Sequence, residues 1–333
     1  MRRGLLEYLA CPSCGTRLTV MVQAEDRDEI LEGTLTCSRC GDLYPVERGV
    51  PRLNRSMESL KRVAQTFGYE WKAHHAGELE DDTLFGRTLD EDWGYFLQAT
   101  KVTESELVGK VVLDAGCGSG RLTRQIAEHG AGVVIGVDIN EAVDNAFAFC
   151  RDLPNVHIVQ ANLFALPFGP AAFDLVWSQG VIHHTPDAAG AHRALARHVK
   201  PGGVLYVWVY AKRFNPFRFT KDVLDAFRVT RLPEPHLLRL SKAFARASLG
   251  LLWVYQCAHR VPGLRPKSIW GQRKVRPRTV RELELTWFDA LSPEYDSRHS
   301  EREVIDWFRQ LGFRDIHALD EPKVGVRGVA PEP

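Results

Sequence analysis

The sequence predicts an α/β fold, a doubly wound and mainly parallel sheet preceded by a small metal-binding unit. Three observations lead to this prediction. A β-branched run, Val111–Ala115, carries an acidic residue and leads into three alternating glycines and a helical segment. Strand-like and helix-like segments then alternate as far as residue 210. Two Cys-x-x-Cys-Gly motifs, which begin at Cys11 and Cys37, come before this region.

Length and composition agree with this organisation. The chain has 333 residues, of which 44% are hydrophobic, so it can bury one large core and still carry additional segments. No apolar run approaches the roughly 18 residues of a membrane span. The residues after Met1 do not form the apolar core of a signal peptide. We therefore expect a cytoplasmic protein, and unpaired cysteines in a metal-like spacing suit that compartment.

The four N-terminal cysteines have the spacing of a zinc site. Cys11 and Cys14 form one pair, and Cys37 and Cys40 form the other. The glycine after each pair permits a tight turn, and four thiolates would hold tetrahedral Zn²⁺ with no open position. We predict a structural zinc within residues 1–55, with two disulfides or a redox dithiol as the alternatives.

The end of this unit, residues 43–53, resembles the zinc ribbon of a known subunit. That subunit is the small activator of tRNA, rRNA and release-factor methyltransferases. The resemblance covers residues 5–53. It implies that a ribbon used elsewhere as a separate subunit is here fused to its enzyme.

The glycine turn is the centre of the predicted site. Gly116, Gly118 and Gly120 let the backbone approach a ligand closely, and the amides that open helix 121–129 suit a carboxylate or phosphate. A dinucleotide site would need the wider G-x-G-x-x-G spacing. The pattern from Asp114 onward resembles motif I of class I S-adenosylmethionine (SAM)-dependent methyltransferases. The resemblance implies SAM binding at Asp114 and the glycines; another nucleotide, or no ligand, is the alternative.

More cofactor contacts are expected where the next two strands end. Asp138 closes strand Val133–Asp138 about 20 residues after the glycines, where a carboxylate can accept both ribose hydroxyls. A turn or helix cap is the alternative role for this residue. Asn162 and Leu163 follow strand Val156–Ala161, where the family usually has an acidic residue that contacts adenine. Asn162 can still form a hydrogen bond with the edge of the base.

Three further motifs extend the resemblance over residues 109–210. They are Phe-Asp in strand 172–178, His-His-Thr-Pro-Asp after it, and Pro-Gly-Gly before the fifth strand. Together they resemble the class I methyltransferases related to the ubiquinone and menaquinone biosynthesis enzymes. Because ligands lie beyond the carboxyl ends of such strands, four side chains are expected to face the methyl group: Ser178, Gln179, His183 and His184. Either histidine could act as a general base; a structural or cofactor-side role is the alternative.

Residues 56–108 are interpreted as a helical lid. They hold 5 Lys or Arg against 11 Asp or Glu, and helix 59–76 carries three aromatic residues: Phe67, Tyr69 and Trp71. Many bacterial small-molecule methyltransferases have a similar Phe-Gly-x-x-Trp segment just before motif I. This resemblance implies that the aromatic residues cover cofactor or substrate, with Phe67 and Trp71 as cofactor contacts. Simple packing on the core is the alternative.

Residues 211–285 interrupt the alternating pattern where the family places substrate-determining insertions. This segment has 17 Lys or Arg against 5 Asp or Glu, in a chain whose net charge is +1. It contains an apolar helix at 237–255 and a basic stretch at 267–281. The charge suits an anionic acceptor or RNA. A solvated insert and a membrane-surface helix are the alternatives.

The remaining residues, 286–333, are expected to complete the sheet. We predict a loop at 287–296, a helix at 301–311 with a capping box from Ser300, and strands at 314–319 and 323–329. By resemblance, these strands make a seven-stranded sheet with an antiparallel last hairpin. Tyr295 and Asp289 are candidates to line the acceptor pocket, and Tyr295 is also a candidate catalytic residue.

These observations predict SAM-dependent methyl transfer by in-line displacement, with S-adenosyl-L-methionine as cofactor and Zn²⁺ as a structural ion. The expected acceptor is a small or carrier-linked metabolite, including an anionic one. Methylation of RNA or protein is one alternative, although no Asn-Pro-Pro-Tyr-type motif follows the fourth strand. A non-catalytic zinc-ribbon adaptor is another. The sequence predicts no oligomeric state.

Overall fold

The computed structural model describes residues 1–54, 58–77, 79, 84–85, 87–213, 216–259, 279–319 and 323–332. The chain divides into two compact units. The first contains Met1–Gly68, Leu89–Ala211 and Tyr295–Pro333, and the second contains Tyr69–Thr88 and Lys212–Glu294. None of the helices within the described residues combines the length and apolar character needed to cross a membrane.

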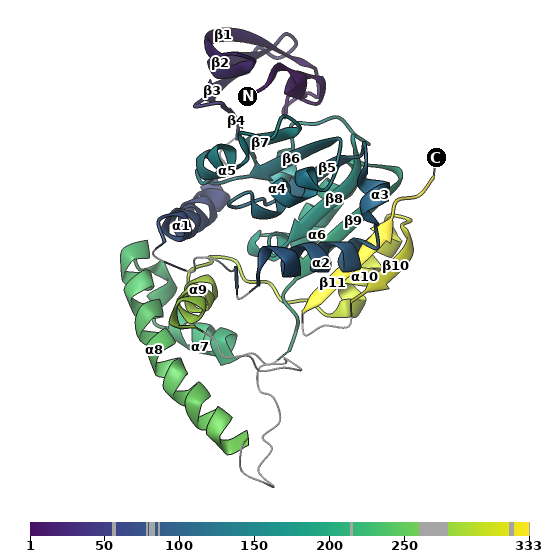
Figure 1. Ribbon diagram of the computed structural model, residues 1–333. Coiled ribbons are helices and arrows are strands. Elements are labelled where there is room, and N and C mark those ends of the chain that lie inside the picture. Colours follow the sequence, from purple (N-terminus) through teal and green to yellow (C-terminus); the bar gives the residue numbers. More distant parts are fainter. Residues whose placement is uncertain are drawn as a thin grey trace. The chain divides into compact units, whose positions relative to one another are not determined.

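Five parallel strands form the centre of the first unit (Figure 1). They are β5 (Val111–Ala115), β6 (Val133–Asp138), β7 (Val156–Ala161), β8 (Phe173–Gln179) and β9 (Val199–Val209). Their side chains are buried on both faces, which explains why they read as continuous apolar runs. β11 (Val324–Val329) pairs antiparallel with β9, and β10 (Arg314–Ala318) pairs antiparallel with β11. The seven predicted core strands are therefore present, in the order β7-β6-β5-β8-β9-β11-β10.

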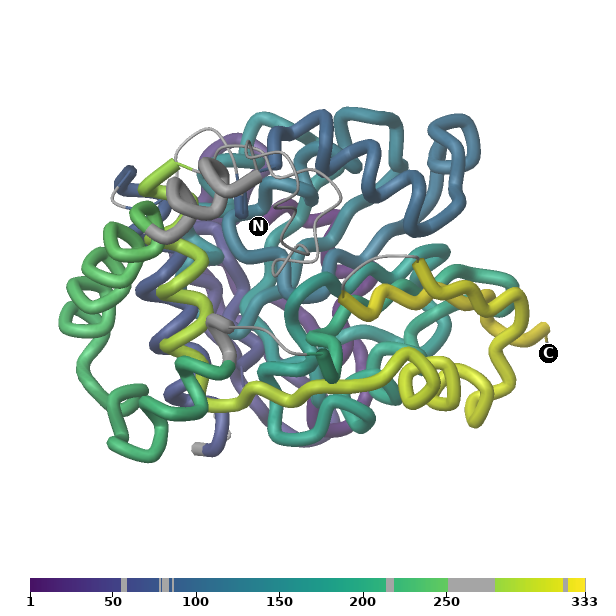
Figure 2. Tube along the Cα trace, turned by 90° about the horizontal axis from the view of Figure 1, so that it is seen from below, coloured from purple at the N-terminus to yellow at the C-terminus, as the bar shows by residue number. Residues whose placement is uncertain are grey.

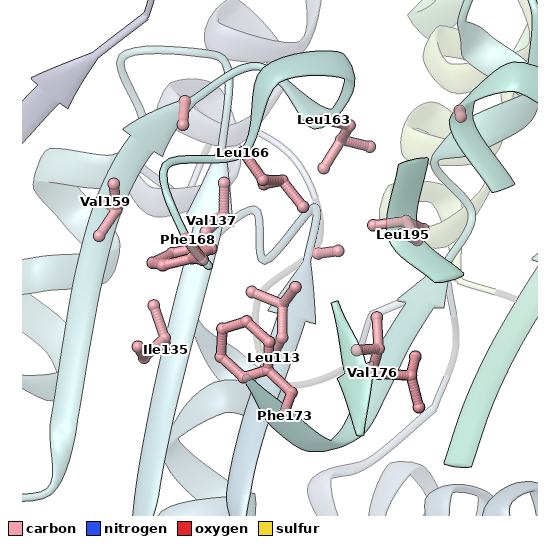
Figure 3. Packing of buried hydrophobic residues seen from close by; sticks show 14 of the residues in the cluster. Leu113, Ile135, Val137, Val159, Leu163, Leu166, Phe168, Phe173, Val176 and Leu195 are labelled. Atoms are coloured by element: carbon pink, nitrogen blue, oxygen red, sulfur yellow. The ribbon is translucent and has the colours of Figure 1, made fainter. Parts of the chain in front are cut away.

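Helices cover both faces of this sheet. One buried cluster joins Val112 and Val134 to residues of α2 (Leu89–Thr100), α4 (Arg121–Glu128) and α5 (Val143–Cys150). The next residues along the strands, Leu113 and Ile135, point to the other face, where α6 (Ala188–Ala196) and α10 (Glu301–Gln310) pack (Figure 3). Neighbouring residues on one strand thus pack against helices on opposite faces of the sheet. The short helix α3 (Glu104–Leu107) precedes β5.

The N-terminal unit is joined to the core sheet. β1 (Leu18–Asp26), β2 (Glu29–Cys37), β3 (Leu43–Glu47) and β4 (Val50–Leu53) form an antiparallel meander. β4 also pairs parallel with β7, so that eleven strands form one sheet. The sequence predicted seven strands with a separate ribbon. The difference arises because the ribbon covers the edge of β7, whose backbone groups would otherwise have no strand partner on that side.

The second unit is helical. It contains the last residues of α1 (Glu58–His75), together with α7 (Pro216–Asp225), α8 (Glu234–His259) and α9 (Val280–Leu291). α8 and α9 lie side by side (Figures 1 and 2). The indole of Trp287 stacks on Phe244 at 4.8 Å, and its Nε1 donates to Ser248. The helix predicted at 237–255 is confirmed within α8, whereas most of the basic stretch at 267–281 lies outside the described residues.

The loop predicted at 287–296 is wrong for its first five residues, which belong to α9. Thr279 caps this helix by accepting a hydrogen bond from the Glu282 backbone. Leu283, Trp287 and Leu291 then recur at four-residue spacing and are buried. This helical period is visible in the sequence, and it outweighs the turn-forming residues that follow it.

Candidate functional site

The glycine turn after β5 has the geometry that the sequence predicted. Gly116, Gly118 and Gly120 have φ values of 91°, 52° and 77°, in the left-handed region that favours glycine. The Gly116 and Cys117 amides donate to the Val137 carbonyl, at 2.7 and 3.0 Å, and tie the turn to the end of β6. A Cβ on Gly116 would lie 2.2 Å from a methyl carbon of Val181, so no larger residue fits there.

Asp138 meets this turn from the neighbouring strand. Its Oδ2 accepts the Gly118 N–H at 2.9 Å, and its Oδ1 accepts the Ile139 N–H and the Asn140 side-chain amide, both at 2.7 Å. Burial raises the pKa of Asp138, while the backbone donors act in the opposite direction. The predicted acid and glycine turn are therefore adjacent. Sequence reasoning missed Asn140, although a short amide directly after an acidic strand end is a recognisable turn signal.

Asp114 lies inside the protein beneath the turn. Its side chain accepts a hydrogen bond from the Thr123 hydroxyl of α4 at 2.6 Å, and the residue is 4% exposed. Burial, together with the nearby Asp138 charge, raises the pKa of Asp114 to about 6. This hydrogen bond joins β5 to α4, so Asp114 connects the two elements on either side of the glycine turn.

The other predicted cofactor residues end strands β7 and β8. The buried Ser178 hydroxyl donates to the Ala115 carbonyl at 3.0 Å and so bridges two strands. The Asn162 side-chain oxygen accepts the Phe164 backbone N–H and caps a 3₁₀ turn, Leu163–Ala165. Leu163 is buried in the core cluster, whereas Gln179 is half-buried at the end of β8.

The histidine pair is buried. The His183 ring packs against His184 and Tyr210, with centroid distances of 4.1 and 3.9 Å, and the last two rings are 5.2 Å apart. Nδ1 of His184 donates to the Tyr295 carbonyl at 2.9 Å, and its ring lies 4.9 Å from that of Phe67. In the neutral ring this leaves Nε2 as the basic nitrogen.

Two further contacts hold the segment around Tyr295. The Tyr295 hydroxyl donates to the Ser59 carbonyl at 3.2 Å. Ser297 donates to the His183 carbonyl through both its backbone N–H and its hydroxyl. The structure thus brings Phe67, His184 and Tyr295 together within the first unit.

The remaining predicted aromatic residues belong to the second unit. Tyr69 stacks on Phe288 with a centroid distance of 5.8 Å, and the ring of Trp71 lies 5.9 Å from that of His74. Asp289 is half-buried on α9. These contacts lie within the helical unit, as expected if Tyr69 and Trp71 serve packing and do not cover a ligand.

The four N-terminal cysteines converge. The sulfur atoms of Cys11, Cys14, Cys37 and Cys40 all lie within 4.8 Å of one another. The Cys14–Cys37, Cys11–Cys40 and Cys14–Cys40 sulfurs are 3.4, 3.6 and 3.7 Å apart. A disulfide would bring two sulfurs to about 2.05 Å. Zn–S bonds of about 2.3 Å in a tetrahedron place sulfurs roughly 3.8 Å apart. The four side chains therefore fit a structural zinc ion and form no disulfide with one another.

Comparison with known proteins finds two family models in the chain. The model described as a methyltransferase domain matches residues 113–207, and the model of Trm112p-like proteins matches residues 2–49. Ubiquinone biosynthesis O-methyltransferase of Pseudomonas fluorescens (strain Pf0-1) is 34% identical over 169 residues, which is 50% of this chain and 68% of the relative. Cycloartenol-C-24-methyltransferase of Arabidopsis thaliana is 33% identical over 114 residues, 32% of this chain and 34% of that protein.

A solved structure resembles a larger part of the chain. It is a chain of the complex that contains the Haloferax volcanii Trm112 methyltransferase activator. The TM-score is 0.49 at 18% sequence identity, and the alignment covers 81% of this chain and 98% of that one.

The raised pKa of Asp114 predicts a pH dependence of stability. Because the folded state binds this proton more tightly than the unfolded state, stability should fall as pH rises from about 4 to about 6. Asp114→Asn cannot ionise, and we expect it to unfold with a free energy higher than wild type by up to about 3 kcal/mol above pH 6. Urea unfolding at a series of pH values measures this difference.

Asp174→Asn is a control for which we expect the opposite change in the free energy of unfolding. Partial burial raises the pKa of Asp174, but hydrogen bonds from Lys200 and from the Val111 N–H outweigh it and lower that pKa. This variant should therefore lose stability at neutral pH. An Asp114→Asn protein with the wild-type slope between pH 4 and pH 6 would contradict our account of that carboxyl group.

Proposed function

The chain belongs to the class I SAM-dependent methyltransferases related to ubiquinone biosynthesis O-methyltransferase, with a Trm112-like domain at its N-terminus, and we propose that it methylates a small or carrier-linked metabolite. The observation that carries the proposal is the junction of two strand ends, where the Gly118 N–H meets the Asp138 carboxylate. Ligands of doubly wound sheets bind at this edge.

The turn and the helix after it suit the cofactor. Gly120 is the N-cap of α4 and has no side chain to cap the helix, so we place the ligand carboxylate at the opening of this helix. Asp138 would hold the ribose hydroxyls, Asn162 and Leu163 would lie beside the adenine, and Phe67 would cover the site. When bound, S-adenosylmethionine supplies a methyl group that its sulfonium makes electrophilic. Gln179, at the end of β8, is the remaining proposed cofactor contact, whereas the Ser178 hydroxyl bonds to the Ala115 carbonyl and Trp71 packs within the helical unit.

The main task of the protein is then alignment. Holding the two reactants in line can contribute roughly 7 to 11 kcal/mol. Where the acceptor must lose a proton, Nε2 of His184 would accept it, because Nδ1 is already held by the Tyr295 carbonyl. Such a base contributes about 10²- to 10⁴-fold. His183, whose ring packs against both His184 and Tyr210, and Tyr295 would support the ring.

Two observations favour a small, anionic acceptor. The relative from Pseudomonas fluorescens is named for O-methylation in ubiquinone biosynthesis, which makes a hydroxyl on a small molecule the first class to test. The inserted segment is strongly basic, and Arg239, Lys242 and Arg246 recur at helical spacing on α8. Such a face attracts a phosphate or carboxylate on the acceptor.

Methyl transfer from radiolabelled SAM tests the acceptor class. The purified protein is incubated with labelled cofactor and a cell extract, which is then separated into metabolites, RNA and protein. We expect label in the metabolites, or in a carrier protein whose thioester-bound acyl group hydroxylamine cleaves off as a hydroxamic acid. Label that stays with RNA or protein after that treatment would contradict the proposal. A reaction that lacks the protein controls for background.

His184→Gln tests the proposed base. Once an acceptor is known, this variant should lower kcat by about 10²-fold or more and flatten the acidic limb of the pH–rate profile. His198→Gln is the matched control, because Nδ1 of His198 makes the same kind of bond, 2.9 Å to the Gly169 carbonyl, before β9 begins. If both variants keep the wild-type profile, His184 serves packing alone.

A further inference from the structure

Three residues from three strands lie in one row across the junction of ribbon and core. The parallel pairing places Arg52 of β4 opposite Gln160 of β7, and Gln160 opposite Asp138 of β6. The ribbon therefore ends beside β7 and one strand away from β6, which presents the proposed ribose ligand (Figure 1). Arg52 also donates to the Gln160 side-chain oxygen at 3.3 Å, which orients the amide of that residue.

Two side-chain amides converge on one backbone carbonyl. Asn54 directly follows β4, and its Nδ2 donates to the Ile139 carbonyl at 3.2 Å. Nε2 of Gln160 donates to the same oxygen at 3.0 Å. One donor thus comes from the end of the ribbon and the other from the core.

A single rigid peptide connects that carbonyl to Asp138. The Ile139 carbonyl and the Asn140 N–H belong to the same planar group, in which the two bonds point in opposite directions. The Asn140 N–H faces Oδ1 of Asp138 at 3.3 Å. The peptide plane that the two amides fix therefore also sets a donor to the carboxylate.

Charged contacts hold the ribbon in the same place. Arg52 is nearly buried and pairs with Asp144, which lies in the first turn of α5. Arg48 reaches the other oxygen of Asp144 at 2.5 Å. Gly49 packs so closely on Phe147 of α5 that a Cβ would lie 2.5 Å from the ring. The ribbon thus contacts α5, which follows the Ile139–Asn140 loop, and also pairs with β7.

We propose that Asn54, assisted by Gln160, is a positioning residue for the cofactor. Its amide holds the Ile139–Asn140 peptide, and that peptide holds the Asp138 carboxylate toward the ribose hydroxyls. The ribbon therefore contributes to cofactor affinity as well as to stability. This inference rests on the proposed function, since it takes Asp138 as the ribose ligand.

The test measures binding of S-adenosylhomocysteine, the demethylated cofactor, to the full chain by calorimetry. Asn54→Ala and Gln160→Ala should each raise the dissociation constant about fivefold, and Asn54→Asp, which keeps the shape but loses the donor, at least as much. Zinc content, measured for each variant, verifies that the ribbon is intact. Gln160→Ala and Asn54→Asp keep the test decisive if Asn54→Ala does not fold.

A matched control separates positioning from stability. Nδ2 of Asn155 also donates to a backbone carbonyl, that of Ala131 at 2.8 Å, but just before β7 begins. Asn155→Ala should lower stability and leave the dissociation constant unchanged. In a double-mutant cycle, Asn54→Ala should weaken binding little further once Asp138 is alanine.

The outcomes distinguish the two claims. A wild-type chain that does not bind S-adenosylhomocysteine, or an Asp138→Ala variant with unchanged affinity, would overturn the cofactor assignment itself. If Asp138→Ala weakens binding while the Asn54 and Gln160 variants bind as wild type, only the positioning role fails. Equal losses for Asn54→Ala in the wild-type and Asp138→Ala backgrounds would also contradict that role.

Discussion

The hydrogen bond from the Gly118 backbone to the Asp138 carboxylate is the contact on which the proposed site depends. It joins the turn after β5 to the end of β6, so that a glycine-rich loop and an acidic group meet at one edge of the sheet. Each side of the contact has its own support. Val137 accepts two amides of the turn, and Asn140 and Ile139 hold the second carboxylate oxygen.

A zinc ribbon that continues the core sheet changes how this fold is stabilised at its edge. β7 ends the core on one side, and a parallel edge strand exposes backbone donors and acceptors. Here β4 pairs with it, while the cysteine cluster lies in the segment before β1 and at the turn between β2 and β3. The metal-binding turns and the strand that pairs with β7 thus belong to one antiparallel meander.

The core strands could be predicted from sequence because each is an apolar run followed by a diagnostic residue. β6 and β7 begin and end at the predicted residues, and the capping box at Ser300 opens α10 as expected. The site was harder to predict. Asp114 and Ser178 end strands, as ligands do, yet they bond to Thr123 and Ala115 inside the protein. Sequence alone does not say to which side the last side chain of a strand turns.

Long-range pairing accounts for most of what the sequence did not reveal. The register that places Arg52 opposite Gln160 joins segments far apart in the chain, and a four-residue strand carries too little pattern to specify its partner. The proposed role of Asn54 depends on that register and on its bond to the Ile139 carbonyl, and nothing in its local sequence marks it. The C-terminal part of α9, where a loop was predicted, had by contrast a readable helical period.

The most direct measurement of the central claim is a crystal structure of the full chain with S-adenosylhomocysteine bound. We predict electron density for the nucleoside at the carboxyl ends of β5 and β6, with both ribose hydroxyls within hydrogen-bond distance of the Asp138 carboxylate. A ligand seated elsewhere, or side chains that fill the space beside the Gly116–Gly120 turn in the bound crystal, would contradict the account.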